Sequence, residues 1–408
     1  MELIKSKLMP VIGKVQHYAW GGNFYLPELL KIPAKPGETY AEYWLGAHPG
    51  GSATLFNDKE RILLSDYIKA FPQQTLGEKV YKEFGTLPYL LKILDVKQML
   101  SIQVHPSKGS AKKAFAEENG KGIALTAPNR NYKDDNHKPE LMMALSEFWL
   151  LHGFKPQEAL ERILSVTPEL KFLTPVFRGG DYKKLYQFVM QMDQAEVNRH
   201  LQPLVDRVLP LYESGSLGKS SEDFWAARAA LTYQQNGNQD RGIFSIYFFN
   251  LVRVQPGGAV FQDAGLPHAY LEGQNVEIMA NSDNVLRGGL TPKHVDVPEL
   301  MKHTRFEATI PRIIPGLPVQ SSVEIFPTPA PDFELGLIRL AKGETLEWQS
   351  ASVQLFIVLE GKAELKENDG AGFSVERGGA WISFDGAWGR LKAVGDLVVY
   401  RGAVGNMD

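Results

Sequence analysis

The residue types that could do chemistry in this chain lie in three short segments. Gln103 and His105 lie two apart in the first segment, and Lys138 and Glu140 lie two apart in the second. In an extended strand, side chains two apart point to the same face. The third segment supplies His268, which follows a Gly-Leu-Pro turn. One amide oxygen, two imidazoles and one carboxylate form a donor set that suits zinc better than manganese, cobalt or iron.

These five residues could also be unrelated to one another. A histidine by itself is more often a structural or surface residue than a metal ligand, and nine histidines in 408 residues is an ordinary number. The pair of Gln103 and His105 alone leaves both interpretations open. The second pair at the same spacing favours a metal site, although spacing alone does not show that the segments converge.

Short strands are the elements that would present these side chains. Residues 1–105 are rich in Gly, Pro and aromatic residues, and apolar runs such as 87–94 are typical of short strands separated by turns. Residues 107–135 are polar, which predicts a loop with a helix around 110–119. A further strand is expected at 137–145, across the second pair.

A helical block follows this first β region. Apolar residues recur at three- and four-residue intervals through 155–172 and 182–212, which indicates helices with one apolar face. A third helix is predicted at 222–233, with Ser221 or the serine before it as the N-cap. Residues 151–241 are therefore expected to form a helical insert.

The pattern typical of β-strands returns at 243–254, and a Pro-Gly turn then leads into a further strand. Residues 322–408 are divided by Gly turns into evenly spaced apolar runs, which favours an antiparallel barrel or jelly roll. Strands are expected there at 333–340, 353–359, 362–366, 373–375, 380–384 and 397–401. Segment 377–382 repeats the Gly turn and strand of 256–261, but no histidine occurs after His303. The C-terminal barrel is therefore predicted to be metal-free and structural.

The composition limits the classes of protein and partner. A chain of 408 residues with 44% apolar and 22% charged residues is typical of a soluble protein of two or three domains. Its net charge of −3 argues against nucleic acid or an anionic membrane as the main partner. The absence of cysteine excludes disulfides, thiolate metal ligands and thiol catalysis, and it is compatible with the cytoplasmic location that we expect. The sequence contains neither a recognisable secretory signal nor an apolar run of about 18 residues, so no membrane span is expected.

Longer blocks of the sequence carry a family resemblance. The order of strand, Pro-Gly turn, strand and Gly-Leu-Pro-His resembles that of cupin barrels. The signature blocks of the type I mannose-6-phosphate isomerases are similar to segments 18–21, 41–46, 87–108, 131–142 and 265–298. The similarity runs in order through the whole chain.

The fold expected from these patterns and from the resemblance is mainly β with an α insert. It consists of two cupin-like jelly-roll or β-barrel domains and an inserted helical domain. The catalytic barrel is expected to comprise 1–150 and 242–321, interrupted by the helical insert 151–241. The metal-free barrel is expected at 322–408.

The resemblance implies a zinc-dependent aldose–ketose isomerase that interconverts mannose 6-phosphate and fructose 6-phosphate through a cis-enediol. It implies one zinc ion per chain, held by Gln103, His105, Glu140 and His268, which are also the residues that the spacing selects. The other active-site positions that it implies are Ser101, Lys138, Tyr270, Glu277, Asp283, Arg287 and Lys293. It further implies a monomer whose partner is a sugar phosphate, with no nucleic acid or membrane partner.

Such an isomerisation moves a proton between C1 and C2 and builds negative charge on O1 or O2, which a divalent cation stabilises. Arg287 is a candidate partner of the enediolate or of the phosphate, because its charge is permanent and its donors are forked. Lys138 beside a metal would have a lowered pKa that suits proton transfer. Asp283 is either the base or the residue that orients Lys138 or His137, and we count all of them, with Tyr270 and Glu277, among the expected catalytic residues.

The phosphate needs cations and hydrogen-bond donors in the same cleft. The candidates are Ser101, Lys92 and Lys293, each of which could instead be a surface residue. Trp20 could form a wall beside the sugar or belong to the core. Glu42 is a candidate for the rim of the pocket.

Other functions fit parts of this pattern. A cupin oxygenase with iron or manganese would favour two or three histidines and a carboxylate with open positions, whereas a Gln ligand with a nearby Lys and Arg suits a phosphorylated polyol better. A non-catalytic sugar-phosphate binding protein could use the same fold. An isomerase of glucose 6-phosphate or another aldose is a nearer alternative. A bifunctional enzyme with a nucleotidyltransferase domain is disfavoured, because no Gly-rich nucleotide loop is present at the start.

Overall fold

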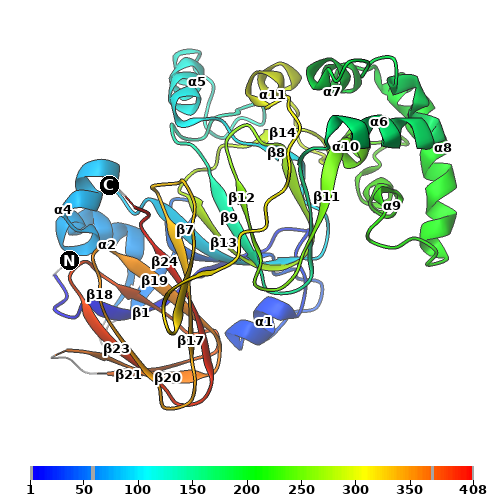
Figure 1. The fold of residues 1–408 in the computed structure, drawn as a ribbon. Coiled ribbons are helices and arrows are strands. Elements are labelled where there is room, and N and C mark those ends of the chain that lie inside the picture. Colours follow the sequence, from blue (N-terminus) through cyan, green and yellow to red (C-terminus); the bar gives the residue numbers. More distant parts are fainter. Residues whose placement is uncertain (1–2, 57–59, 369–371, 407–408) are drawn as a thin grey trace.

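Two large antiparallel sheets and one small sheet carry the strands in the described part of this protein (Figure 1). The computed structural model describes residues 3–56, 60–368 and 372–406. Helices between residues 157 and 248 lie on one side of the central strands, and the C-terminal strands lie on the other side (Figure 1). The fold is therefore mainly β with a helical part, as the sequence predicts.

The first large sheet carries the predicted metal ligands in or next to its strands. Its strands are hydrogen-bonded in the order β11 (Phe249–Val254), β10 (Phe148–Phe154), β13 (His268–Ala280), β7 (Tyr89–Val96), β3 (Glu42–His48) and β2 (Lys14–Gln16). Shorter strands branch from this path, namely β4 (Gly51–Ser52) on β3, β9 (Glu140–Ala144) between β13 and β12 (Ala259–Gln262), and β8 (Gln103–Val104) between β13 and β14 (Leu286–Arg287). Strands β3, β7, β9 and β10 are buried at every residue, so other parts of the protein cover both of their faces.

A glycine in the long strand β13 marks the point at which the strand changes pairing partners. Gly273 has a φ angle of 130°, and a Cβ atom there would lie only 2.6 Å from Cδ2 of Phe148. The part of β13 before this glycine pairs with β10, and the part after it pairs with β7 and β9. One strand therefore brings His268 and Glu277 from two parts of the sheet to the same pocket, and only glycine has the backbone freedom that this bend needs.

The second large sheet contains the C-terminal strands. Its order is β15 (Leu317–Gln320), β16 (Val323–Phe326), β17 (Glu334–Leu340), β24 (Leu397–Ala403), β19 (Gln354–Glu360), β22 (Ala380–Ser383), β1 (Leu8–Ile12), β5 (Thr54–Phe56) and β6 (Arg61–Leu63). The four-stranded sheet has the order β18 (Thr345–Gln349), β23 (Trp388–Ala393), β20 (Lys362–Glu367) and β21 (Phe373–Glu376). All six strands predicted for this part of the chain are present, whereas β16, β18 and β23 were not predicted.

The two large sheets share one apolar core. Strand β1 from the start of the chain lies between β22 and β5, so the second sheet combines the two ends of the sequence. The Tyr89 hydroxyl of β7 donates to the Gly402 carbonyl of β24 at 2.8 Å. Buried side chains of β3, β7 and β13 belong to the same core cluster as those of β17, β19 and β24. The C-terminal barrel therefore packs directly against the sheet that carries the predicted ligands.

In the helical part, one predicted helix begins and ends at the residues expected from the sequence. Helix α9 spans Glu222–Tyr233, and its N-cap Ser221 accepts a hydrogen bond from the Asp223 amide. The predicted helix at 155–172 is instead α6 (Gln157–Val166) followed by a 3-10 helix (Pro168–Leu173), because Pro168 cannot continue the hydrogen-bond ladder. The block at 182–212 is likewise two helices, α7 (Tyr182–Met190) and α8 (Gln194–Glu213).

Several helices correct the sequence-based expectation of β structure. Residues 243–248 belong to helix α10 (Gly242–Phe248) and not to a strand, because a short and fully apolar run has no periodicity that separates the two. Four short helices interrupt the strands expected in 1–105, namely α1 (Tyr25–Leu30), α2 (Leu64–Ala70), α3 (Pro72–Leu76) and α4 (Glu78–Phe84). Helices this short depend on tertiary packing, which local sequence does not reveal.

Two further helices flank the pocket side of the first sheet. The predicted helix at 110–119 is α5 (Lys108–Gly120), and its N-cap Ser107 accepts from the Ser110 amide. Helix α11 (Val297–His303) was not predicted. Within the part of the chain that the structure describes, no helix combines the length and the apolar character that crossing a membrane requires. The division into catalytic, helical and C-terminal domains at the residues given above stays a prediction.

Candidate metal centre

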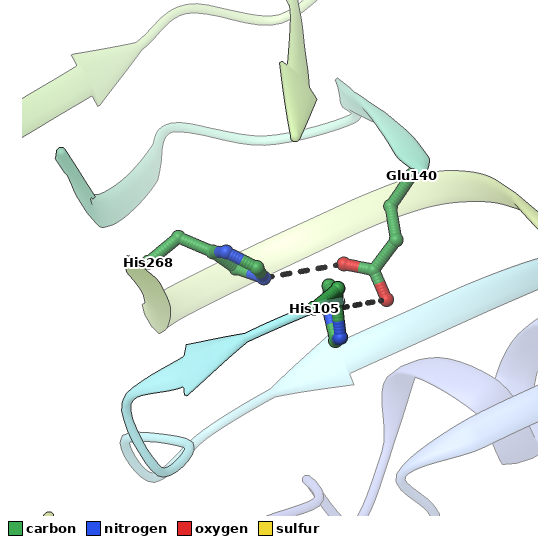
Figure 2. Close-up of side chains that lie close together, drawn as sticks. All are labelled: His105, Glu140 and His268. Carbon is green, nitrogen blue, oxygen red and sulfur yellow. Dashed lines mark ion pairs between the residues drawn. The ribbon is translucent and has the colours of Figure 1, made fainter. Parts of the chain in front are cut away.

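Three predicted ligands from distant parts of the chain meet in the interior of the first sheet (Figure 2). The ligand atoms of His105, Glu140 and His268 all lie within 4.8 Å of one another, and all three residues are buried. Nε2 of His105 lies 3.5 Å from Oε1 of Glu140, and Nε2 of His268 lies 3.3 Å from Oε2 of the same carboxylate. The Glu140 carboxylate therefore lies between two imidazole nitrogens.

Strand ends place these ligands. His105 directly follows β8, Glu140 is the first residue of β9, and His268 is the first residue of β13. The strand expected at 137–145 thus begins only at Glu140, and Lys138 lies in the loop before it. Lys138 still reaches the same site, since its Nζ lies 3.0 Å from Oε1 of Glu140.

Backbone carbonyl groups orient both imidazole rings. Nδ1 of His105 lies 2.9 Å from the Asn284 carbonyl oxygen, and Nδ1 of His268 lies 2.9 Å from the Leu266 carbonyl oxygen. A carbonyl only accepts, so Nδ1 carries the hydrogen in both rings and Nε2 presents a lone pair to Glu140. Nε2 of His105 is buried and has no hydrogen-bond partner among the described residues. Two lone pairs that face one carboxylate call for a cation between them, so the residues present fit a bound metal ion.

The protonation states of these groups also suit a metal. Burial lowers the pKa of His105 to about 4, although the nearby Glu140 carboxylate opposes this shift. The pKa of Glu140 lies well below its usual range, because the charge of Lys138 and the contact with His105 outweigh the opposite effect of burial. At neutral pH the imidazole of His105 is therefore neutral and the carboxylate is ionised, as metal ligation requires.

Gln103 lies in the same row of residues as His268. It is the register partner of His268 on β13 and of Arg287 on β14, and register partners on neighbouring strands project from the same face. Gln103 also lines one pocket with Glu140 and His268. This placement supports Gln103 as the fourth ligand and brings Arg287 toward the centre, and both roles stay predictions.

Buried charges form the floor of this pocket. Nζ of Lys92 lies 2.9 Å from Oε1 of Glu277 and 3.4 Å from Oε2 of Glu42. These carboxylates raise the pKa of Lys92 against the opposite effect of burial. The Glu42 carboxylate also accepts a hydrogen bond from Nε1 of Trp44. Lys92, which was predicted to bind phosphate, and Glu42 are thus joined in one buried ion-pair cluster.

Tyr270 and Glu277 lie at the same pocket. The Tyr270 hydroxyl is buried and has no hydrogen-bond partner in the described part of the chain. Burial raises the pKa of Tyr270 well above its usual value, and the charge of Glu277 adds to the rise. Burial also raises the pKa of Glu277, which Lys92 opposes and Glu140 favours. Tyr270 is therefore a protonated donor beside the Glu277 carboxylate.

Two predicted cations have no carboxylate partner in the ranges that the structure describes. Arg287 is half-buried, and burial lowers the pKa of its guanidinium. Burial also lowers the pKa of Lys293, and the charge of Arg287 lowers it further. Ser101 is partly buried in the segment before β8. An anionic group of a ligand could balance the two cations.

Three other predicted residues have partners outside the ligand set. Asp283 is exposed, and its Oδ1 lies 3.5 Å from Nε2 of His48. His137 turns toward the C-terminal part of the chain, where its Nε2 lies 2.9 Å from Oδ2 of Asp332. Trp20 is partly buried and stacks on Tyr18 with ring centroids 5.8 Å apart.

Comparison with known proteins identifies the family. The family model described as "Phosphomannose isomerase type I, catalytic domain" matches residues 8–157. The mannose-6-phosphate isomerase of Escherichia coli (strain K12) is 38% identical over 367 residues, which cover 88% of this chain and 90% of that protein. The chain belongs to the type I phosphomannose isomerases. The mannose-6-phosphate isomerase of Homo sapiens is also similar, with 34% identity over 384 residues that cover 86% of this chain and 87% of that protein.

Solved structures of phosphomannose isomerases have the same fold. A zinc-bound mannose 6-phosphate isomerase superposes with a TM-score of 0.87 and 32% identity over 98% of this chain and 100% of that chain. The Salmonella typhimurium enzyme bound to substrate (f6p) and a zinc atom gives the same TM-score, identity and coverage. The cupin fold expected from the sequence is therefore confirmed.

Sequence reasoning did not identify three residues that support this phosphomannose isomerase site. His48 is buried beside Asp283, Asp332 is buried beside His137, and Asn284 holds the ring of His105 through its carbonyl. His48 and Asn284 lie in or next to the blocks that resemble the family, but no spacing rule assigns them a partner. Asp332 comes from the C-terminal barrel, so only the packing of the two barrels reveals it.

Proposed function

We propose that this protein interconverts mannose 6-phosphate and fructose 6-phosphate at a zinc site in the first sheet. One observation carries the proposal, namely the two buried imidazoles whose Nε2 atoms face the Glu140 carboxylate. Membership of the phosphomannose isomerase family supports it, as does the related structure bound to f6p and zinc. Zinc, when bound, supplies a Lewis acid for the charge that develops on O1 or O2 of the sugar.

The proposed ligands are Gln103, His105, Glu140 and His268, with one zinc ion per chain. One carboxylate and three neutral donors leave this site with a net positive charge, which suits the polarisation of a carbonyl. Lys138 has its ammonium 3.0 Å from the Glu140 carboxylate, so it brings a second positive charge and a proton to the edge of the site.

The proposed proton-handling groups line the rest of the pocket. The protonated hydroxyl of Tyr270 can donate to a sugar oxygen, because it lines the same pocket as the proposed ligands. Glu277 can take up a proton more readily than an ordinary glutamate, since burial raises its pKa. Asp283 is exposed and lies beside His48, and it is proposed to act as the base or to orient a neighbour. His137, bound to Asp332, is proposed to assist from the C-terminal side.

The proposed phosphate site consists of Arg287, Lys293 and Ser101. Neither Arg287 nor Lys293 has a carboxylate partner in the described ranges, and the charge of Arg287 lowers the pKa of Lys293, so phosphate would balance both charges. Lys92 has two carboxylate partners, which supports a role in holding the pocket floor together with Glu42. Trp20, stacked on its neighbouring tyrosine, is proposed as a wall beside the sugar.

Several finer statements belong to the same proposal. We propose a cytoplasmic monomer that binds a sugar phosphate and neither nucleic acid nor membrane. The net charge of −3 supports the second part. The catalytic barrel is proposed to comprise 1–150 and 242–321, with 151–241 as the helical insert and 322–408 as the metal-free barrel, whose sheet is completed by β1, β5 and β6 from the first of these segments.

A coupled assay tests the proposal. Purified protein is analysed for metal, assayed with mannose 6-phosphate, depleted with a chelator, and assayed again after zinc is added back. We expect activity that disappears on chelation and returns with about one zinc per chain. Zinc-loaded protein that isomerises only glucose 6-phosphate or another aldose phosphate would refute the substrate assignment. A folded protein that binds no metal would refute the site itself.

A further inference from the structure

One buried asparagine connects the two loops beside the proposed metal centre. The first loop, 133–136, leads to Lys138 and Glu140, and the second loop, 281–284, leads from β13 to Arg287. Asn284 lies at the end of the second loop and is only 1% exposed. Its side chain contacts the first loop, whereas its backbone contacts a proposed ligand.

The side-chain amide of Asn284 uses both its acceptor and its donors on the first loop. Its Oδ1 accepts from the Lys133 amide at 2.7 Å and from the Asp134 amide at 3.3 Å. Its Nδ2 donates to the carbonyl oxygens of Asp134 and Asn136, both at 2.8 Å, and to Oδ1 of Asp134 at 3.1 Å. An amide can accept from backbone N–H groups and donate to carbonyl groups at the same time, whereas an ionised carboxylate can only accept.

Asp134 closes the same connection from the first loop. Its Oδ1 accepts from the Ser282 hydroxyl at 2.8 Å, and its Oδ2 accepts from the Asp283 amide at 2.7 Å. The two loops are therefore joined by side chains from both sides. A shift of one loop would move the other.

The backbone carbonyl of Asn284 carries this connection to the metal centre. It accepts the hydrogen on Nδ1 of His105 at 2.9 Å, which directs Nε2 of that ring toward Glu140. The partner of a ligand histidine sets the tautomer and orientation of its ring. Here that partner is a loop carbonyl, so its position depends on what holds the loop.

We infer that Asn284 is a positioning residue for the metal site, an inference that rests on the proposed function. Its side chain fixes loop 281–284 against loop 133–136, and this contact sets the carbonyl that orients His105. The same contact fixes the loop that leads to Glu140, so two proposed ligands from different segments are placed by one amide. Loss of the amide would loosen the site before any ligand is removed.

The variant N284D tests this inference because it keeps the size of the side chain and removes the donors. A carboxylate oxygen would then face two carbonyl oxygens and the Asp134 carboxylate. We expect zinc affinity, measured by competition with a chromogenic chelator, to fall by at least about tenfold, the lower end for supporting partners of ligands. The visible spectrum of the cobalt-substituted protein should also change, because it reports ligand geometry.

The variant N198D is the matched control. Asn198 on α8 likewise joins a loop to its own element, since it accepts from the Gln239 amide at 2.9 Å and donates to Asn238 at 2.8 Å. It contacts none of the proposed ligands. The same chemical change there should leave zinc affinity within about twofold of the parent, well below the loss that a supporting partner causes.

The variant D134N provides a second test if N284D does not fold. It leaves Asn284 in place and weakens the connection from the other loop, so a smaller loss of zinc affinity is expected. Parent-like zinc affinity and an unchanged cobalt spectrum in folded N284D, or in D134N where N284D is unfolded, would overturn the inference alone. Parent protein that binds no zinc would instead overturn the proposed function.

Discussion

Removal of the Lys92 charge should lower the free energy of unfolding far more than removal of the Glu277 charge, which lies closest to it. The Lys92 side chain is 7% exposed, and those of Glu277 and Glu42 are 3% and 9% exposed. In K92M, two buried carboxylates lose their shared counter-charge, and breaking a buried pair in this way costs about 3–5 kcal/mol. In E277Q, Lys92 keeps Glu42 at 3.4 Å, and a carboxylate whose pKa burial already raises is removed.

Urea unfolding of the metal-free variants measures this difference. We expect K92M to lower the free energy of unfolding by about 3–5 kcal/mol and E277Q by less than about 2 kcal/mol. The double variant K92M/E277Q should be more stable than K92M, because one of the two unpaired carboxylates is gone. A K92M protein that is no less stable than E277Q would refute the reasoning that the lysine is the shared counter-charge of the cluster.

Three further changes have distinct expected outcomes. E140Q should lower zinc affinity by more than about 100-fold, because a direct ligand loses its charge. Loss of a residue that only supports a ligand costs up to about 100-fold. Equilibrium dialysis with metal analysis measures the affinity. R287K should keep zinc bound but raise KM for fructose 6-phosphate by about tenfold, since a lysine cannot form the forked contact with phosphate or enediolate; steady-state kinetics measures this. Burial lowers the pKa of the buried His152 imidazole to about 4 in the folded protein, whereas in the unfolded chain this imidazole takes up a proton near pH 6.5. The metal-free protein should therefore lose about 3 kcal/mol of its free energy of unfolding as pH falls from about 6.5 to 4. Urea unfolding across this pH range, compared with that of H152Q, measures the loss.

Surface residues of the same type provide the controls. Glu147, just before β10, and Arg253, on β11, form a partly exposed ion pair at 2.7 Å. The variants E147Q and R253K should therefore change neither zinc affinity nor KM. Weak zinc binding in E147Q, or a parent-like KM in R287K, would contradict the assigned roles. A pH dependence of stability in H152Q as steep as in the parent would show that His152 does not take up the proton.

The sequence could select candidate ligands because residues of suitable chemistry lie two apart in short segments, and their role as ligands stays a prediction. Gln103 and His105, or Lys138 and Glu140, need only extended backbone to share a face, which is a local property. Helix 222–233 and the six predicted C-terminal strands were also local, since apolar periodicity and Gly turns mark them. The fold class followed from the same patterns together with the family blocks.

Other parts of the fold depend on contacts between distant segments. The short helices between 25 and 84 and the helix at 242–248 have no period long enough to identify them, and burial against the sheets decides their conformation. Strand β1 pairs with β22 across most of the sequence. A hydrophobic pattern tells which face is buried but not which strand lies beside it.

The sequence by itself determined which side chains could hold a metal and which family the chain resembles. Only the tertiary structure decided how those side chains face one another. The bend at Gly273 brings His268 and Glu277 to one pocket, the Asn284 carbonyl directs the ring of His105, and Lys92 is enclosed by two carboxylates. The physical reason is that spacing along the chain sets the direction of a side chain relative to its own strand, whereas hydrogen bonds and burial between strands set the distances on which metal binding and pKa depend.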